Sequence, residues 1–241
     1  MIAGMIEPKF VGEIVDYLMA QNGEAEKFSN LFLAAKCLTD VRNRKEIVKT
    51  AHQLLNCFKD LTKYDLNYYY DPSRDVEETK LVQEIRTQAV AAIAITWKDD
   101  ATTLPWLKQR ATADYDSYVR GAAVQALASN FKDDKDTLPI LKSRATADDD
   151  KYVRRAAVQA LGKWFKDEPE LFDIYYNCAV NDPFKRKEND ETNPRRIALE
   201  IIVKQHPHHP QTLPLLRDRA ENDPDEKVRE FAQKKLREWG E

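Results

Sequence analysis

The sequence predicts an all-α solenoid, an array of helix pairs that stack on one another, and the repeats are the main reason. The passage "TADYDSYVRGAAVQAL" at Thr112 is followed by "TADDDKYVRRAAVQAL" at Thr146. Residues 103–136 and 137–170 share 23 identities in 34 positions without a gap. The segment from Thr212 restates the same pattern. A fixed period of this size is the signature of a repeat array of about five to six helix pairs.

Each unit is predicted to contain two helices. The first begins at "TLP", where a threonine can cap free amide groups and a proline occupies the first turn at no cost in hydrogen bonds. These positions are Thr103, Thr137 and Thr212, with Pro105, Pro139 and Pro214. An Asp-rich turn follows, and an acid then stands directly before the second helix, where it can accept hydrogen bonds from the first amides. These acids are Asp116, Asp150 and Asp225.

The second helix carries the apolar stripe that stacking would bury. Val119, Ala122, Ala123, Ala126 and Leu127 follow the i, i+3, i+4 spacing of a helix face. Neither helix can cover this face alone, so neighbouring units must cover it for each other. A charge at Leu127 or Leu161 is therefore expected to disrupt the array.

Composition excludes several classes of protein. Charged residues make up 33% of the chain and glycine occurs only 6 times, which indicates a helical protein with charged outer faces. The net charge of −3 gives no general attraction to phosphate. The three cysteines lack a CxxC pairing, and the start is broken by Glu7 and Pro8, so we expect reduced thiols and a cytoplasmic protein without a signal peptide or membrane span.

The repeats resemble the HEAT-repeat family, most strongly at residues 75–170 and 212–241. The resemblance implies a right-handed superhelix that is concave on the side of the second helices. In HEAT repeats an Asp of the turn and a basic residue six positions later form a ladder between units. The matching pairs are Asp114 with Arg120, Asp148 with Arg154, and Asp223 with Arg229. An Arg fork can satisfy a carboxylate and the next unit's backbone together.

The repeats look most like those that follow the NTPase domain of cyanobacterial NACHT-type signalling ATPases. "NLFLAAKCLTDVRNR" at 30–44 is similar to the segment that leads into those repeats. No glycine of the chain heads a GxxxxGK[ST] phosphate loop, so the ATPase itself is missing. The resemblance implies the sensor arm of a larger protein or a stand-alone relative.

The organisation predicted along the chain has two parts. Residues 1–74 form an irregular helical capping region, and residues 75–241 form the repeats. The repeats are regular at 103–136 and 137–170, and 212–241 is the last. The unit at 171–211 carries about seven extra residues, because Asp182 finds its matching Arg195 thirteen positions on.

Exposed positions of the second helices are the first candidates for binding. They vary between otherwise matching repeats and should line one row of the concave surface, although neutral drift would give the same variation. They are Gln125, Ser129, Arg155, Gln159 and Lys163.

Two loops are further candidates. Tyr68, Tyr69 and Tyr70 belong to a tyrosine-rich loop at 64–75, and tyrosine is favoured at interface hot spots. The same rings could instead pack down and cover the capping unit. The insertion at 183–193 carries Lys185, Arg186 and Lys187, which could contact phosphate or form part of a solvated loop.

Catalysis and metal binding find little support in the sequence. "QHPHHPQ" at 205–211 holds three histidines, but alternating prolines mark a linker and no Cys or acid stands at zinc spacing. The sequence has no GxSxG or HExxH signature. We therefore expect no catalytic set, no metal site and no cofactor.

The predicted function is that of a non-catalytic binding scaffold, a ligand-sensing or protein-docking arm of a signalling or defence system. A protein is the expected partner. Two alternatives stay open: a HEAT-like phycobilin lyase, and a nucleic-acid-binding helical-repeat protein, with a purely structural linker as a third. The sequence leaves the partner's identity and the oligomeric state open.

Overall fold

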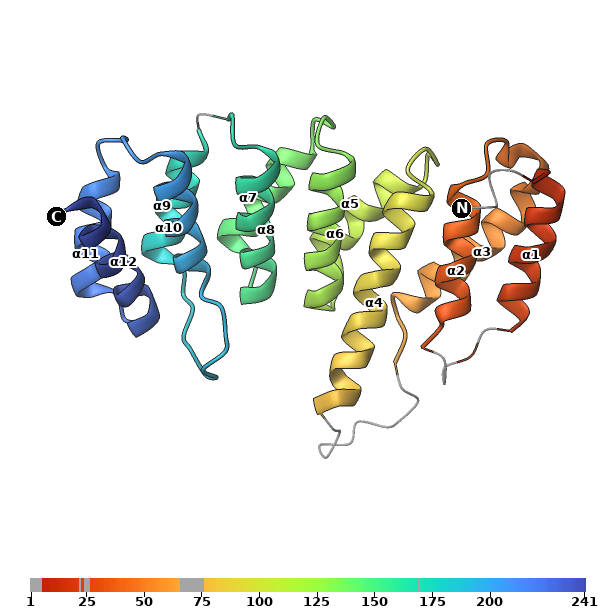
Figure 1. Ribbon diagram of the computed structural model, residues 1–241, viewed down its shortest axis with the longest axis horizontal. Coiled ribbons are helices and arrows are strands. Elements are labelled where there is room, and N and C mark those ends of the chain that lie inside the picture. The colour runs from red at the N-terminus through yellow and green to blue at the C-terminus, as the bar shows by residue number, and fades with distance from the viewer. Residues whose placement is uncertain (1–5, 22, 24–26, 66–75, 169) are drawn as a thin grey trace. The chain divides into compact units, whose positions relative to one another are not determined.

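The computed structural model describes residues 6–21, 23, 27–65, 76–168 and 170–241. Within these residues the chain forms α-helices, one 3-10 helix and no strand, which confirms the all-α class (Figure 1). Contacts divide the chain into two compact units, Met1–Ala126 and Leu127–Glu241. In the part of the chain placed here, no helix combines the length and the apolar character that crossing a bilayer requires.

The first unit contains the helices that precede the regular repeats. Its elements are α1 (Pro8–Ala20), α2 (Ser29–Thr39), η2 (Arg44–Ile47), α3 (Val48–Leu61), α4 (Val76–Thr96), α5 (Thr103–Ala113) and the first part of α6 (Ser117–Asn130). Phe58 lies at the centre of its core, with its ring 5.3 Å from Phe32 and 5.7 Å from Trp97. These aromatic contacts join α2, α3 and the end of α4 into one cluster.

The second unit consists of successive helix pairs. Its elements after α6 are α7 (Thr137–Ala147), α8 (Lys151–Trp164), α9 (Leu171–Asn181), α10 (Pro194–Gln205), α11 (Thr212–Asn222) and α12 (Glu226–Trp239). The two members of each pair pack on each other, and the second helices α8, α10 and α12 contact one another in order. Each helix pair of the second unit thus covers the apolar face of the next pair, as the repeat pattern predicts.

The apolar stripe of the second helices is buried. Leu127 and Leu161 are fully buried, as are Val119, Val153 and Val228 at the start of the same stripe. Ala123 and Ala157, on the same stripe of α6 and α8, are fully buried as well. The predicted burial of this stripe is confirmed for the described residues, except that Ala122 on α6 is half-buried.

The threonine at the start of each first helix does not cap that helix, and this part of the prediction was wrong. Thr137 Oγ1 donates a hydrogen bond of 2.8 Å to the carbonyl oxygen of Phe131, and Thr212 Oγ1 one of 2.7 Å to that of His206. Both acceptors lie just after the preceding second helix, six residues earlier. The hydroxyl therefore closes the turn between units, because the helix leaves its last carbonyl groups without intrahelical partners.

The acids before the second helices do cap them, as predicted. Asp116 Oδ1 accepts from the Val119 amide at 2.9 Å, Asp150 Oδ1 from Tyr152 at 2.7 Å and Asp225 Oδ1 from Lys227 at 3.0 Å. In the unit with the insertion Asn193 takes this role and accepts from the Arg195 amide at 2.9 Å. The insertion forms the long loop between α9 and α10 that is visible in Figure 1.

Leu161→Asp is expected to lower the free energy of unfolding by about 3–5 kcal/mol, because it places an unpaired charge in the fully buried seam. Urea unfolding followed by circular dichroism measures the loss. Gln159→Asp on the exposed face of the same helix is the control, and we expect it to change stability little. A native-like midpoint for Leu161→Asp would contradict the seam.

Candidate functional site

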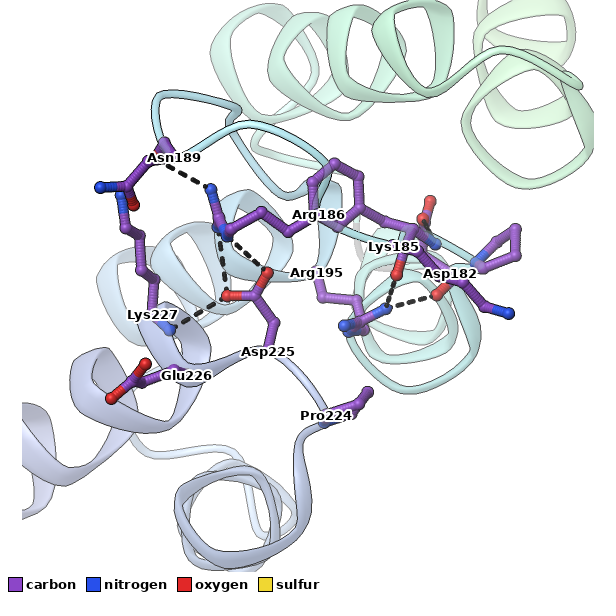
Figure 2. A pocket seen from close by; sticks show the side chains of 11 residues that line it. Asp182, Lys185, Arg186, Asn189, Arg195, Pro224, Asp225, Glu226 and Lys227 are labelled. Carbon is purple, nitrogen blue, oxygen red and sulfur yellow. Dashed lines mark hydrogen bonds and ion pairs between the residues drawn. The ribbon is translucent and has the colours of Figure 1, made fainter.

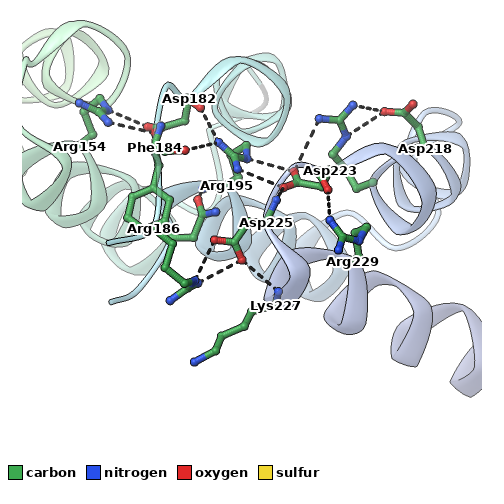
Figure 3. Close-up of polar contacts among 12 residues, drawn as sticks. Arg154, Asp182, Phe184, Arg186, Arg195, Asp218, Asp223, Asp225, Lys227 and Arg229 are labelled. Carbon is green, nitrogen blue, oxygen red and sulfur yellow. Dashed lines mark hydrogen bonds and ion pairs between the residues drawn. The ribbon is translucent and has the colours of Figure 1, made fainter. Parts of the chain in front are cut away.

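A buried arginine links each turn of the second unit to the next. Arg154, which is 4% exposed, directs Nε and Nη2 at the two carboxylate oxygens of Asp182, at 2.7 and 3.0 Å (Figure 3). Its Nη1 donates to the main-chain oxygens of Asp148 and Asp149 at 2.9 and 3.0 Å. Burial by itself would lower the pKa of Arg154, but the Asp182 carboxylate together with Asp150 and Asp148 outweighs burial and raises it, so the guanidinium stays charged.

Arg195 repeats this arrangement across the insertion. It binds Asp223 through two hydrogen bonds of 3.0 and 3.1 Å, and its Nη1 donates to the main-chain oxygens of Asp182 and Phe184 at 2.7 and 3.1 Å. Arg195 therefore occupies the position of Arg154 in its unit, although the insertion moves it along the sequence. In the first unit Arg86 of α4 forms an ion pair with Asp116.

The ladder runs in the opposite sense to the one expected. Within a unit the arginine binds the main-chain oxygen of the turn Asp: Arg120 with Asp114 at 3.0 Å, Arg154 with Asp148, and Arg229 with Asp223 at 2.6 Å. The carboxylate that Arg154 or Arg195 binds belongs to the next repeat along the chain. We expected a carboxylate of the same unit and the backbone of the next. The guanidinium has five N–H donors in one plane, so it can bind the turn carbonyl of its own repeat and the carboxylate of the next repeat together.

The insertion is anchored by a further ion pair that the sequence analysis did not anticipate. Arg186 binds Asp225 at the start of α12 through hydrogen bonds of 3.0 and 3.1 Å, and it also donates to the main-chain oxygens of Asn189 and Glu191. Glu191 in turn pairs with Lys151 of α8. Burial alone would raise the pKa of Asp225, but its hydrogen bonds with Arg186 and with Asn193 bring it below the ordinary value.

These pairs decide which residues of the insertion remain free for a ligand. Arg186 is engaged by the Asp225 carboxylate and by two main-chain oxygens, so its proposed role as a phosphate contact is not supported by this geometry. Lys185 and Lys187 are exposed. A hollow of about 490 Å³ lies between the insertion and α12, and Figure 2 shows Arg186 facing Asp225 there while the Lys227 side chain points to Asn189. Arg186 is neutralised by Asp225, and the lining holds acids and bases in nearly equal number, so the hollow has little net charge to attract an ion.

Some of the second-helix residues expected to be exposed are exposed, and others are half-buried. On α8, Gln159 and Lys163 are exposed and Arg155 is half-buried, while on α6 Ser129 is exposed and Gln125 half-buried. Arg155 lies 5.2 Å from the centre of the Tyr152 ring, and Lys163 Nζ lies 4.7 Å from that of Trp164. These cation–π contacts hold the aliphatic parts of the Arg155 and Lys163 side chains along the helix. Gln159 therefore lies between two positively charged residues.

A groove of about 480 Å³ lies between α8 and α10, and Gln159 and Lys163 are part of its lining. Gly162 lets the helices approach here, because a Cβ at this position would lie 2.6 Å from Ile201 Cδ1. Gln205 Nε2 closes one end by donating to the main-chain oxygen of Gly162 at 2.6 Å. The residues of α10 in this groove were not identified from the sequence, because the insertion obscures the register of that repeat.

The tyrosine-rich segment begins at Tyr64, within the described residues. Tyr68, Tyr69 and Tyr70 lie outside the described residues. Tyr64, at the start of the same segment, packs edge-on against Phe28 with ring centres 5.0 Å apart. Its main-chain oxygen accepts a hydrogen bond of 2.6 Å from Arg86 Nε. This tyrosine is half-buried and packs against the core of the first unit.

The reactive side chains are held in unreactive environments. Burial raises the pKa of Cys178 to about 12, and burial also raises the pKa of Cys37 and Cys57, so all three stay neutral thiols. His206 and His209 pack on Phe172 with ring centres 5.5 and 3.5 Å away. Among the described residues no three His, Cys, Asp or Glu side chains are grouped as a metal would require.

Comparison with known proteins gives one match. Residues 81–162 match the family model described as HEAT repeats. The match covers most of α4 and the two regular helix pairs, and it supports HEAT repeats in this part of the chain. HEAT repeats generally serve as scaffolds for protein interactions. Searches of curated proteins and of solved structures find no match.

Replacing Arg195 with Met should lower the free energy of unfolding by about 3 kcal/mol, because the buried Asp223 carboxylate loses its two-bond fork and keeps the longer ion pair with Arg219 at 3.7 Å. Its neighbour Arg196 is a matched control, since it pairs with Glu200 near the surface, where both side chains are about 40% exposed, and should cost less than about 1 kcal/mol when replaced by Met. Urea unfolding of the two variants compares them directly. Equal losses would show that the ladder does not hold the turns.

The Arg186–Asp225 pair should make the insertion sensitive to acid. The pKa of Asp225 is lowered from its ordinary 3.8, so the pair contributes stability above that pH and loses it as the pH falls through the folded-state value. The difference in urea midpoint between the wild type and Arg186→Gln should therefore be largest near neutral pH and shrink in acid below the ordinary pKa. A difference that does not change with pH would contradict the pair.

Proposed function

We propose that this protein is a non-catalytic scaffold that binds another protein through the exposed face of its second helices. The observation that carries the proposal is the division of polar side chains between two locations. Arg154 and Arg195 at the turns are buried in the ladder, whereas Gln159 and Lys163 on the second helix stay exposed beside a groove. A surface that offers exposed side chains on rigid helices is suited to binding by shape.

The match to HEAT repeats supports the same function, because such repeats generally act as interaction scaffolds. The lining of the α8–α10 groove adds to this. Its floor is aliphatic, with Ile197 and Ile201, and the groove lining contains no aromatic residue. Nucleic-acid sites for single strands rely on aromatic stacking, and a tetrapyrrole would need an acid and an aromatic wall. The groove therefore favours a protein over both alternative ligands.

The resemblance to the repeats of NACHT-type NTPases supports a finer proposal. In this view the chain is a sensing or docking arm of a signalling or defence system in the cytoplasm. Cys37, Cys57 and Cys178 are all unpaired thiols, as is usual in a reducing compartment. The partner of such an arm would be recognised along successive second helices, and the first helices would face away from it.

Site-specific photo-cross-linking in cells tests the proposed surface. A photoreactive amino acid at Gln159 of α8 should give a discrete cross-linked protein, because this position lies in the groove lining. The same amino acid at Asp173, on the exposed side of the first helix α9, is the control and should give no such product. Cross-linking from Asp173 alone, or from neither position, would contradict a scaffold that uses its second helices.

A further inference from the structure

The α8–α10 groove has a charge opposite in sign to that of the chain. The protein carries a net charge of −3, yet the groove is lined by three lysines, Lys163, Lys166 and Lys204. All three are exposed, and none forms an ion pair with another described residue. The acid of the lining, Glu200, is already bound by Arg196 at 3.0 Å. The groove therefore presents positive charge that the protein itself does not neutralise.

Between the lysines the groove is apolar. Ile197 and Ile201 are half-buried and stand one turn apart on α10, so they face the groove together. Gly162 on the opposite helix brings α8 close enough to meet Ile201. Without a side chain at Gly162, the floor of the groove is made by Ile201 itself. A ligand that fits must cover two isoleucine side chains and meet lysines from both helices.

We propose that the α8–α10 groove binds an acidic amphipathic segment of a protein, whose aliphatic side chains cover Ile197 and Ile201 while its carboxylates face Lys163, Lys166 and Lys204. This inference rests on the proposed function and specifies the chemistry of the partner. Laying an amphipathic segment into a groove is a common mode of peptide recognition. Carboxylates opposite exposed lysines add selectivity and speed up association, and the buried apolar contact supplies most of the affinity.

The groove favours a protein segment over nucleic acid for two reasons. Its floor is aliphatic, so it has no platform on which bases could stack. The lysines lie on either side of apolar side chains. A phosphate backbone bound to these lysines would place its charges over the isoleucines, which is unfavourable because charges there lose hydration. A carboxylate-bearing segment satisfies the lysines and the floor at the same time.

Fluorescence anisotropy with the full chain tests the proposal, using a short fluorescein-labelled peptide built only of Glu and Leu in an amphipathic pattern. Lys163→Glu with Lys204→Glu should weaken binding by about tenfold, because two attractive contacts become repulsive. The matched control is Lys132→Glu with Lys135→Glu, which makes the same charge change on exposed lysines in the turn before α7 and should bind like the wild type.

The same peptide with Gln in place of Glu should bind at least several-fold more weakly to the wild type, and a single-stranded DNA should compete poorly. Lys163→Gln with Lys204→Gln gives a milder loss if the reversed variant fails to fold, which circular dichroism would reveal. No binding to the wild type, equal binding by both lysine double variants, or preference for the DNA would each overturn the acidic segment. In that case a cross-link at Gln159 would still support a scaffold for a partner of other chemistry.

Discussion

The structure of the second unit depends on a buried arginine that holds two consecutive turns at once. A turn placed between stacked helices leaves carbonyl groups and a carboxylate away from water, and each of these needs a partner. Arg154 and Arg195 supply it, since one guanidinium reaches the carbonyls of its own turn and the carboxylate of the next. Stacking distance and angular position are therefore constrained by one side chain per unit.

Such a pair does not by itself make the protein more stable. Burying two charges costs several kcal/mol of lost hydration for each ion, and their attraction offsets this only when the remaining donors and acceptors are satisfied. Here the Asp223 carboxylate also accepts the Asp225 amide at 2.9 Å, so a single acid serves the fork and its own turn. A unit shifted along its neighbour would lose these bonds together, so the ladder fixes register while the apolar seam supplies most of the stability.

The insertion shows how a solenoid can accept extra chain without losing its stacking. Arg195 keeps the position of the ladder arginine because Asn193 starts α10 with the same side-chain cap that Asp supplies elsewhere. The added residues are then tied to two neighbours, to α12 through Arg186 and to α8 through Glu191. Arg186 and Glu191 are engaged within the protein in this way, whereas the lysines of the α8–α10 groove stay exposed to a partner.

The repeats of the sequence determined the helices, the buried seam and the Asp caps, because period and capping chemistry are local properties. They also located Gln159 and Lys163 on an exposed face, since alternating buried and exposed positions follow from the helical period. Tertiary structure alone decided the rest. Which carboxylate an arginine grips, where the Thr137 hydroxyl donates, and that Gly162 opens a groove onto Ile201 all depend on distances between residues far apart in the chain. Those distances are set by how one helix pair packs on the next.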